Sequence, residues 1–201
     1  QDGTVAIGKG ALTALTSGGS NTAVGYQAGL ALTTGSSNTV LGYGALDDMV
    51  EGGNNIAIGK NALGGALDAT ADASTHNVFV GKDAGSGDWD TAVSEKNVGI
   101  GNETLMGAMN GANNNTAVGH GALTALTTGD SNTVMGYNAG VSITDGHDNI
   151  IIGQQAGDVT TSVGFSVIIG AAACGSGDMT AAADGTVSIG SEALKALTTG
   201  A

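Results

Sequence analysis

The chain has 201 residues, of which 37 are glycine and none is proline or arginine, and only 3% are aromatic. Eighteen acidic residues against five lysines give a formal net charge of −13, which excludes charge-driven binding to nucleic acid or to an anionic membrane surface. No apolar run approaches the ~18 residues of a membrane-spanning helix, so we expect no membrane insertion in this segment.

A short motif, an aliphatic residue followed by glycine, recurs along the whole chain. The intervals between these glycines are 17, 17, 17, 22, 20, 18, 17, 17, 17 and 20 residues. A fixed short period over a full chain indicates stacked repeats, each of which buries its apolar side against its neighbours. We therefore predict a single repeat solenoid over residues 1–201: an all-β, parallel β-roll or β-solenoid of about eleven coils. The repeat glycines are Gly8, Gly25, Gly42, Gly59, Gly81, Gly101, Gly119, Gly136, Gly153, Gly170 and Gly190.

Residues 5–7 form the first predicted strand. Ile7 and its equivalents directly before each glycine are large and apolar, and Val5 and its equivalents two residues earlier are β-branched. Residues two apart on a strand share a face, and β-branched side chains suit a pleated sheet. We predict a short strand whose buried side carries these two columns, while the column between them, which begins with Ala6, faces elsewhere.

Gly8 and its equivalents mark the corner that follows each strand. Glycine is expected where a positive φ or a close approach of two backbones excludes a Cβ. Three residues after it stands alanine in ten of the eleven units, from Ala11 to Ala193, with Thr104 as the exception. A small residue in this column predicts tight packing.

The second half of each unit, such as "ALTALTSG" at residues 11–18, has more than one interpretation. Its spacing of Ala and Leu by three and four suits one helical turn ended by Gly18, and it also suits a second strand or an irregular return. Because one helical turn has little stability alone, the pattern favours a strand or an irregular return and leaves a short helical turn open.

Asparagine stands four residues before most of the repeat glycines. Asn tolerates tight corners, and its amide can bond the equivalent amide of the next coil, so we predict a turn stabilised by a ladder of side chains. The members of this column are Asn21, Asn38, Asn55, Asn77, Asn97, Asn115, Asn132 and Asn149.

The column directly after each glycine contains all three tyrosines and three of the five lysines. Stacked ~4.8 Å apart, these residues would form an aromatic and cationic stripe on an acidic rod, and such residues are enriched at binding anchors. A solvated ladder or a contact between chains is the alternative, and the residue pattern favours it over receptor or glycan binding. The candidate binding stripe comprises Tyr26, Tyr43, Lys60, Lys82, His120 and Tyr137.

Three longer units predict loops around residues 64–76, 85–96 and 174–186. Loops on a rigid solenoid often carry recognition, and Trp89, between two aspartates, is expected to be an exposed contact residue. Packing of this loop on the neighbouring coil is an equally good interpretation. Cys174 stands in a column occupied elsewhere by leucine, so we predict a buried hydrophobe and not a reactive thiol.

A coil of 17 residues encloses only a thin line of side chains, so such a rod would gain by packing against copies of itself. We expect a homo-oligomer, and a homotrimer above other states. The absence of a recurrent carboxylate pair, a nucleophile motif or a metal-binding motif predicts a protein that is not an enzyme and has no cofactor or metal site.

The recurrent "VAIG", "NIAIG", "NTAVG" and "TVSIG" stretches resemble the head repeats of trimeric autotransporter adhesins of the YadA type. Repeats of the form "NTAxGYxAL…TTG" are also similar to those of phage tail-fibre and other trimeric surface-fibre proteins. The resemblance implies a left-handed β-roll, three chains around one axis, an extracellular, cell-surface or virion tail-fibre location, and attachment to a host surface protein, matrix or glycan. The units here are longer than the typical adhesin head repeat.

The leading functional hypothesis is therefore a structural and adhesive segment of a trimeric fibre. One alternative is a filament subunit that stacks end to end, since joining residue 201 to residue 1 would preserve the glycine spacing. A weaker alternative is ice binding through Thr22, Thr39, Thr116 and Thr133, which are expected to lie on the buried strand face and therefore to argue against it.

Overall fold

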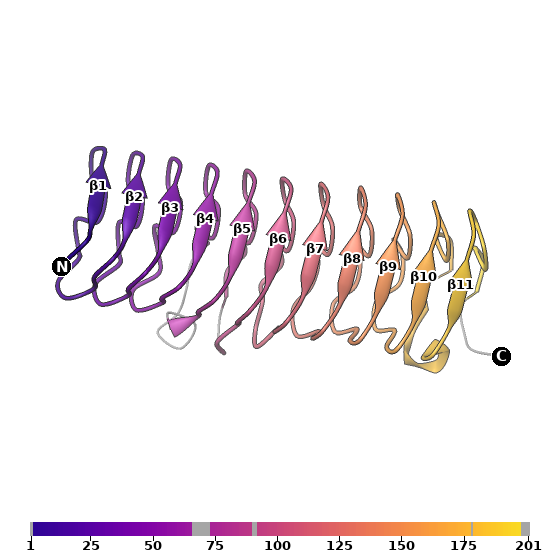
Figure 1. Ribbon diagram of the computed structural model, residues 1–201. Coiled ribbons are helices and arrows are strands. Elements are labelled where there is room, and N and C mark those ends of the chain that lie inside the picture. The colour runs from indigo at the N-terminus through magenta and orange to yellow at the C-terminus, as the bar shows by residue number, and fades with distance from the viewer. Residues whose placement is uncertain (1, 66–72, 90–91, 178, 198–201) are drawn as a thin grey trace.

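The computed structural model describes residues 2–65, 73–89, 92–177 and 179–197, which form a rod of stacked coils (Figure 1). Within these residues, eleven three-residue strands lie in one parallel sheet in sequence order, and a 3₁₀ turn, η2, spans Ala181–Ala183. The predicted all-β parallel solenoid is confirmed. The strands are β1 (Val5–Ile7), β2 (Thr22–Val24), β3 (Thr39–Leu41), β4 (Ile56–Ile58), β5 (Val78–Val80), β6 (Val98–Ile100), β7 (Thr116–Val118), β8 (Thr133–Met135), β9 (Ile150–Ile152), β10 (Val167–Ile169) and β11 (Val187–Ile189).

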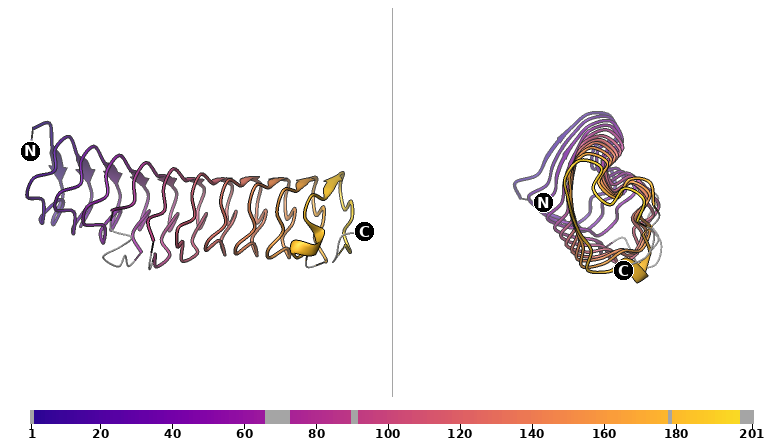
Figure 2. Two further views of the ribbon diagram at one scale, coloured as in Figure 1. Left: turned by 90° about the horizontal axis from the view of Figure 1, so that it is seen from below. Right: turned by 90° about the vertical axis from the view of Figure 1, so that its right-hand side faces the viewer.

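Equivalent residues of successive coils pair directly. Val5 pairs with Thr22 and Ile7 with Val24, and this register recurs along the sheet. The ladder continues into the corner, where the Gly25 N–H donates to the Ile7 carbonyl at 2.8 Å. Figure 2, viewed along the rod, shows successive coils lying over one another with a gradual turn of the stack.

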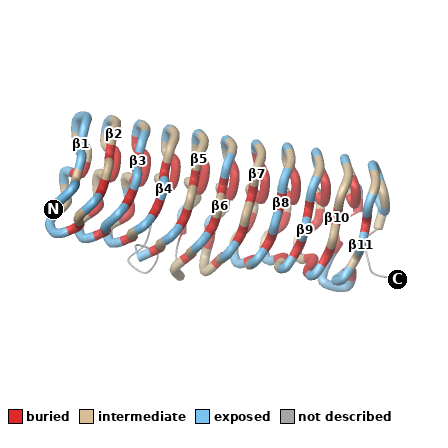
Figure 3. The backbone as a smooth tube through the Cα atoms, viewed as in Figure 1, coloured by how far each residue is buried: buried red, intermediate tan, exposed pale blue. Residues whose placement is uncertain are grey.

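Ten of the eleven strands, all except the terminal β1, bury their middle residue, so the predicted orientation of the strand faces is wrong. Val40 and Ala57 are almost fully or fully buried, whereas Leu41 beside Val40 and Ile56 beside Ala57 are 47% and 36% exposed. A three-residue strand in a thin coil directs one side chain inward and two outward, and the narrow interior has little room for bulk. The alternation of buried and exposed positions is visible along the strands in Figure 3.

The repeat glycines make the stacking possible. Gly25 has φ of +146°, and a Cβ placed on it would lie 2.1 Å from the carbonyl oxygen of Gly42 in the next coil. Both the expected positive φ and the expected close backbone approach are thus observed, and either would disfavour any other residue.

The asparagine column forms the expected ladder inside the rod. The backbone N–H of Asn38 donates to Asn21 Oδ1 at 2.9 Å, and its Nδ2 donates to the same oxygen at 3.1 Å and to the Gly52 carbonyl at 2.9 Å. After Asn149 the column continues with Ser166, whose N–H donates to Asn149 Oδ1 at 3.0 Å. All eight asparagines are buried, so their amides satisfy backbone groups that water cannot reach.

The second half of each coil returns through turns. Apart from 3₁₀ geometry at η2 and Ala73 and an isolated β-bridge at Trp89, the described residues of these segments contain neither helix nor a second strand of the sheet, so the irregular return is the correct interpretation. Ala28 and Leu46 pack inside, and Leu46 has φ of +51°, a conformation that side chains other than Gly, Asn and Asp rarely adopt.

The structure reverses the prediction that Trp89 is an exposed contact residue. Trp89 is fully buried and meets Phe79 edge-on, with ring centroids 5.9 Å apart. The expected exposed contact residue is therefore a core residue, because a 20-residue coil can enclose an indole ring. Cys174 is buried, as predicted. Of the three predicted loops, residues 66–72, 90–91 and 178 lie outside the described residues.

Candidate interaction surfaces

The outward side of the sheet, here called the outer sheet face, is a continuous surface of apolar and threonine side chains. It consists of the first and third residues of every strand, and all of them are Val, Ile, Leu, Met or Thr. Leu41, Met135 and Ile150 on this face are 47%, 50% and 43% exposed, although their strands are not at either end of the rod. At ~4.8 Å per strand and ~3.3 Å per residue, the face projects about 50 Å by 10 Å, or roughly 500 Å².

Size and composition make this face a candidate interaction surface. The largest apolar patch on a soluble monomer is typically about 300–600 Å² and is often functional. The face also contains no charged side chain, in a protein of net charge −13. Sequence reasoning identified both columns but assigned them to the interior, because aliphatic side chains in a chain considered alone are expected to be buried.

The four threonines named for ice binding belong to the same face. Thr39 and Thr133 are exposed, and Thr22 and Thr116 are half-buried. The expectation that they lie on a buried face is wrong, because the first residue of each strand points outward.

All six residues of the candidate binding stripe are exposed. At its N-terminal end, the rings of Tyr26 and Tyr43 stack with centroids 5.0 Å apart and an interplanar angle of 14°. Lys60 Nζ lies 5.9 Å from the Tyr43 centroid, within the range of a cation–π contact. Both faces of Tyr43 thus have neighbours in the chain, which leaves its edge and hydroxyl for any partner.

Further along the stripe, the side chains contact carboxylates as well as a ring. Lys82 Nζ lies 2.6 Å from Asp83 Oδ2 and 3.9 Å from Glu103, and His120 lies 3.9 Å from Glu103 and 5.6 Å, between ring centroids, from Tyr137. The hydrogen bond and charge of Asp83 raise the pKa of Lys82. Burial, the largest single influence on Asp83, would raise its pKa, but Lys82 and a hydrogen bond from Asn61 together hold that pKa below its usual value. The stripe is thus a partnered surface ladder, and its role in binding stays a prediction.

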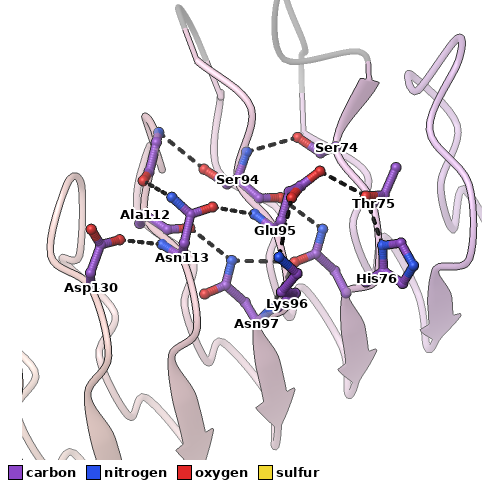
Figure 4. Close-up of polar contacts among 12 residues, drawn as sticks. Ser74, Thr75, His76, Ser94, Glu95, Lys96, Asn97, Ala112, Asn113 and Asp130 are labelled. Atoms are coloured by element: carbon purple, nitrogen blue, oxygen red, sulfur yellow. Dashed lines mark hydrogen bonds and ion pairs between the residues drawn. The ribbon is translucent and has the colours of Figure 1, made fainter.

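A polar cluster lies at the corner that precedes the strands, whereas the candidate binding stripe follows them (Figure 4). This cluster was not predicted. Thr75 Oγ1 donates to Glu95 Oε1 at 2.8 Å, the Glu95 N–H donates to Asn113 Oδ1 at 2.8 Å, and the Asn113 N–H donates to Asp130 Oδ1 at 2.5 Å. Each side chain therefore satisfies a backbone group of the preceding coil or extends the chain of bonds. An open hollow of about 500 Å³ lies against this cluster, between Val93, Lys96 and Asn114.

Asp47 is the most perturbed acid on the rod. It is half-buried, its Oδ1 has no hydrogen-bond partner, and burial together with the charge of Asp48 raises its pKa to about 6. Burial and the charge of Asp88 also raise the pKa of Asp48. In the part of the chain that the structure describes, no three His, Cys, Asp or Glu side chains are grouped as metal ligands.

Comparison with models of protein families, with curated proteins and with solved structures found no match to this chain. Among the described residues there is no helix with the length and apolar character that a membrane crossing requires.

Proposed function

We propose that this chain is a non-enzymatic structural segment of an extracellular fibre, on a cell surface or a virion tail, built by packing copies of itself along the outer sheet face. The observation that carries the proposal is this regular, uncharged apolar face on the outside of a highly acidic rod. Burial of such a face is favourable at roughly 25 cal/mol per Å² of apolar area, and a copy of the same rod offers a surface of matching length and chemistry.

A homotrimer is the preferred state. Three chains around one axis would each turn the outer sheet face inward and leave the acidic corners in water. The resemblance to the YadA-type head and tail-fibre repeats supports the same arrangement. In such a rod the surface stripe would be present three times and in register, so weak contacts with a host glycan or surface protein would gain strength through avidity.

The test places charge on the face. Leu41→Glu combined with Met135→Glu adds carboxylates at two exposed positions, so the fold of one chain should persist while association is lost. The matched control is Thr34→Glu with Thr128→Glu, at exposed corners of the same two coils.

Light scattering and sedimentation then give the mass of each protein. We expect a fixed mass near three chains for the wild type and the control, and a single chain for the face variant. A wild-type monomer would refute the proposal, and a mass that grows without limit would support end-to-end stacking instead.

A further inference from the structure

The outer sheet face carries a second, longer period of five strands. The first residues of strands β1 to β5 are Val, Thr, Thr, Ile and Val, those of β6 to β10 are again Val, Thr, Thr, Ile and Val, and β11 begins with Val. The identical pairs are Val5 and Val98, Thr22 and Thr116, Thr39 and Thr133, Ile56 and Ile150, Val78 and Val167, and Val98 and Val187.

The inward-facing middle residues follow this period poorly. Of the six corresponding pairs, only Ala23 with Ala117 and Val40 with Val134 are identical, while Phe79 corresponds to Ile168 and Ala57 to Ile151. The third residues of the strands, which also face outward, agree in four of the six pairs, with Leu41 and Met135, and Val80 and Ile169, as the exceptions. The five-strand pattern is thus strongest outside, where packing within one chain does not require it.

The pattern changes the chemistry of the face along the rod. Thr22 with Thr39, and Thr116 with Thr133, form two hydroxyl-bearing bands, and each band is followed by an isoleucine. A threonine buried against an aliphatic residue loses water without gaining a hydrogen-bond partner, whereas a threonine opposite a threonine regains one. The face therefore discriminates between alignments of two copies.

We infer that copies of this chain pack through the outer sheet face in parallel, and that the two threonine bands fix their axial register at an offset of zero or of five strands. Three chains around one axis run parallel, and among parallel overlaps of more than one strand only these two offsets place every threonine opposite another threonine. A closed trimer requires the zero offset, whereas the five-strand offset gives a staggered fibre. An offset of one strand already places Thr22 opposite Val5 and Ile56 opposite Thr39. The inference rests on the proposed self-assembly and specifies its geometry, with five strands corresponding to about 24 Å along the rod.

The register can be measured with nitroxide labels at Thr34 and Thr128, which lie at exposed corners five coils apart, away from the outer sheet face. Cys174 is replaced by alanine so that each chain carries one thiol. Pulsed dipolar spectroscopy then gives the distance between copies for each site alone and for a mixture of the two singly labelled chains.

In-register packing gives equal, short distances at both sites and a longer one in the mixture. A five-strand offset gives equal, long distances at both sites and a short one in the mixture. A third label at the exposed Ser17, which occupies the same repeat position as Thr34, separates a five-strand offset from antiparallel packing, since all parallel arrangements give the same distance at all three sites. Unequal distances among the three sites indicate antiparallel packing and overturn the inference, as does a broad spread of distances. A wild-type chain that stays monomeric by mass instead refutes the proposed function, so the two failures are distinguishable.

A variant pair tests whether the hydroxyls set the register. Changing Thr22, Thr39, Thr116 and Thr133 together to Val preserves side-chain shape and removes the hydroxyls, whereas changing the same four to Ser preserves the hydroxyls. We expect the Val variant to assemble with several distances in place of one, and the Ser variant to retain the wild-type distance. A single sharp wild-type distance in the Val variant would overturn the role of the threonine bands.

Discussion

Phe79 occupies the space that Gly99 leaves empty in the next strand. A Cβ on Gly99 would lie 2.7 Å from Phe79 Cδ1, and a Cβ on Gly85 would lie equally close to the same atom. The two residues are paired across β5 and β6, so the largest inward side chain of the sheet stands beside the smallest. A large side chain in one coil is thus accommodated by a small residue in the neighbouring coil, so the two positions should be energetically coupled.

Gly99→Ala should destabilise the rod by about 1–3 kcal/mol, because the added methyl group forces the Phe79 ring from its position. Adding Phe79→Ile, the residue found at the equivalent Ile168, should make the same glycine substitution much less costly. Chemical denaturation of the two single variants and the double variant gives the coupling. Additive effects of the two changes would show that they do not share this space.

Gly42 and Gly190 occupy the same position in the repeat, yet they should differ in how much stability is lost when each is replaced by alanine. A Cβ on Gly42 would lie 2.2 Å from the Gly59 carbonyl oxygen, whereas the nearest atom to a Cβ on Gly190 is Ala193 Cβ at 3.8 Å. Gly42→Ala should cost more than ~4 kcal/mol, the range of exceptional substitutions. Gly190→Ala should cost only the strain of its positive φ, about 1–3 kcal/mol. Equal losses on thermal unfolding would show that strain and not stacking dominates.

Replacing an asparagine at the centre of the ladder should destabilise the rod. Asn115 Oδ1 accepts from both the N–H and the Nδ2 of Asn132, at 3.0 Å and 2.9 Å. Asn115→Ala leaves the buried Asn132 N–H unpaired, removes one of the two bonds of Asn132 Nδ2 and removes the bond that Asn115 Nδ2 donates to the Gly129 carbonyl. We therefore expect a loss of about 2–5 kcal/mol from the free energy of unfolding. The exposed Thr128→Ala serves as control and should change it by less than ~0.5 kcal/mol. A loss as small as that of the control would mean that water replaces the missing amide.

Asp47 should make the rod less stable as the pH rises. Its pKa is about 6 in the folded chain against 3.8 for the free group, so between these values the folded state binds more protons and stability falls with increasing pH. Because the group is half-exposed, solvent screening reduces the effect to about 1 kcal/mol. Asp47→Asn should remove this contribution and be more stable than the wild type at pH 7.

Denaturation midpoints at pH 4 and pH 7 measure the difference between the two proteins. The exposed Asp145→Asn is the matched control and should preserve the wild-type pH dependence. If Asp47→Asn gave the same profile as the wild type, the perturbed group would lie elsewhere.

The backbone-determined columns could be read from the sequence, and the orientation of the strands could not. Gly25 and Asn38 occupy positions where backbone conformation and the next coil select one residue type, so their recurrence indicates their role directly. Val5 and Ile7 recur equally well, but their chemistry indicates burial without saying what buries them. A chain considered alone suggests its own interior, whereas the structure places these residues outside.

Trp89 illustrates a second limit. Its neighbours Asp88 and Asp90 and its place in a longer unit suggest an exposed loop. Its burial depends on contact with Phe79, and this contact cannot be inferred without knowing how the coil closes around its interior. The stripe was easier to locate, since Tyr26 and Tyr43 follow the repeat glycines directly, but the contacts that occupy its rings and charges could not be inferred from spacing.

The regular stacking also determines how the rod can fold. Paired strand residues such as Val5 and Thr22, or Ile56 and Val78, are 17 to 22 positions apart in a chain of 201, so contacts span about a tenth of its length. Sheet proteins usually join distant segments and fold slowly, while this connectivity is as local as that of a helical bundle. Residues such as Leu46, held at positive φ, gain their conformation only from a neighbouring coil. Folding should therefore nucleate at one pair of adjacent coils and propagate along the rod by adding one neighbouring coil at a time.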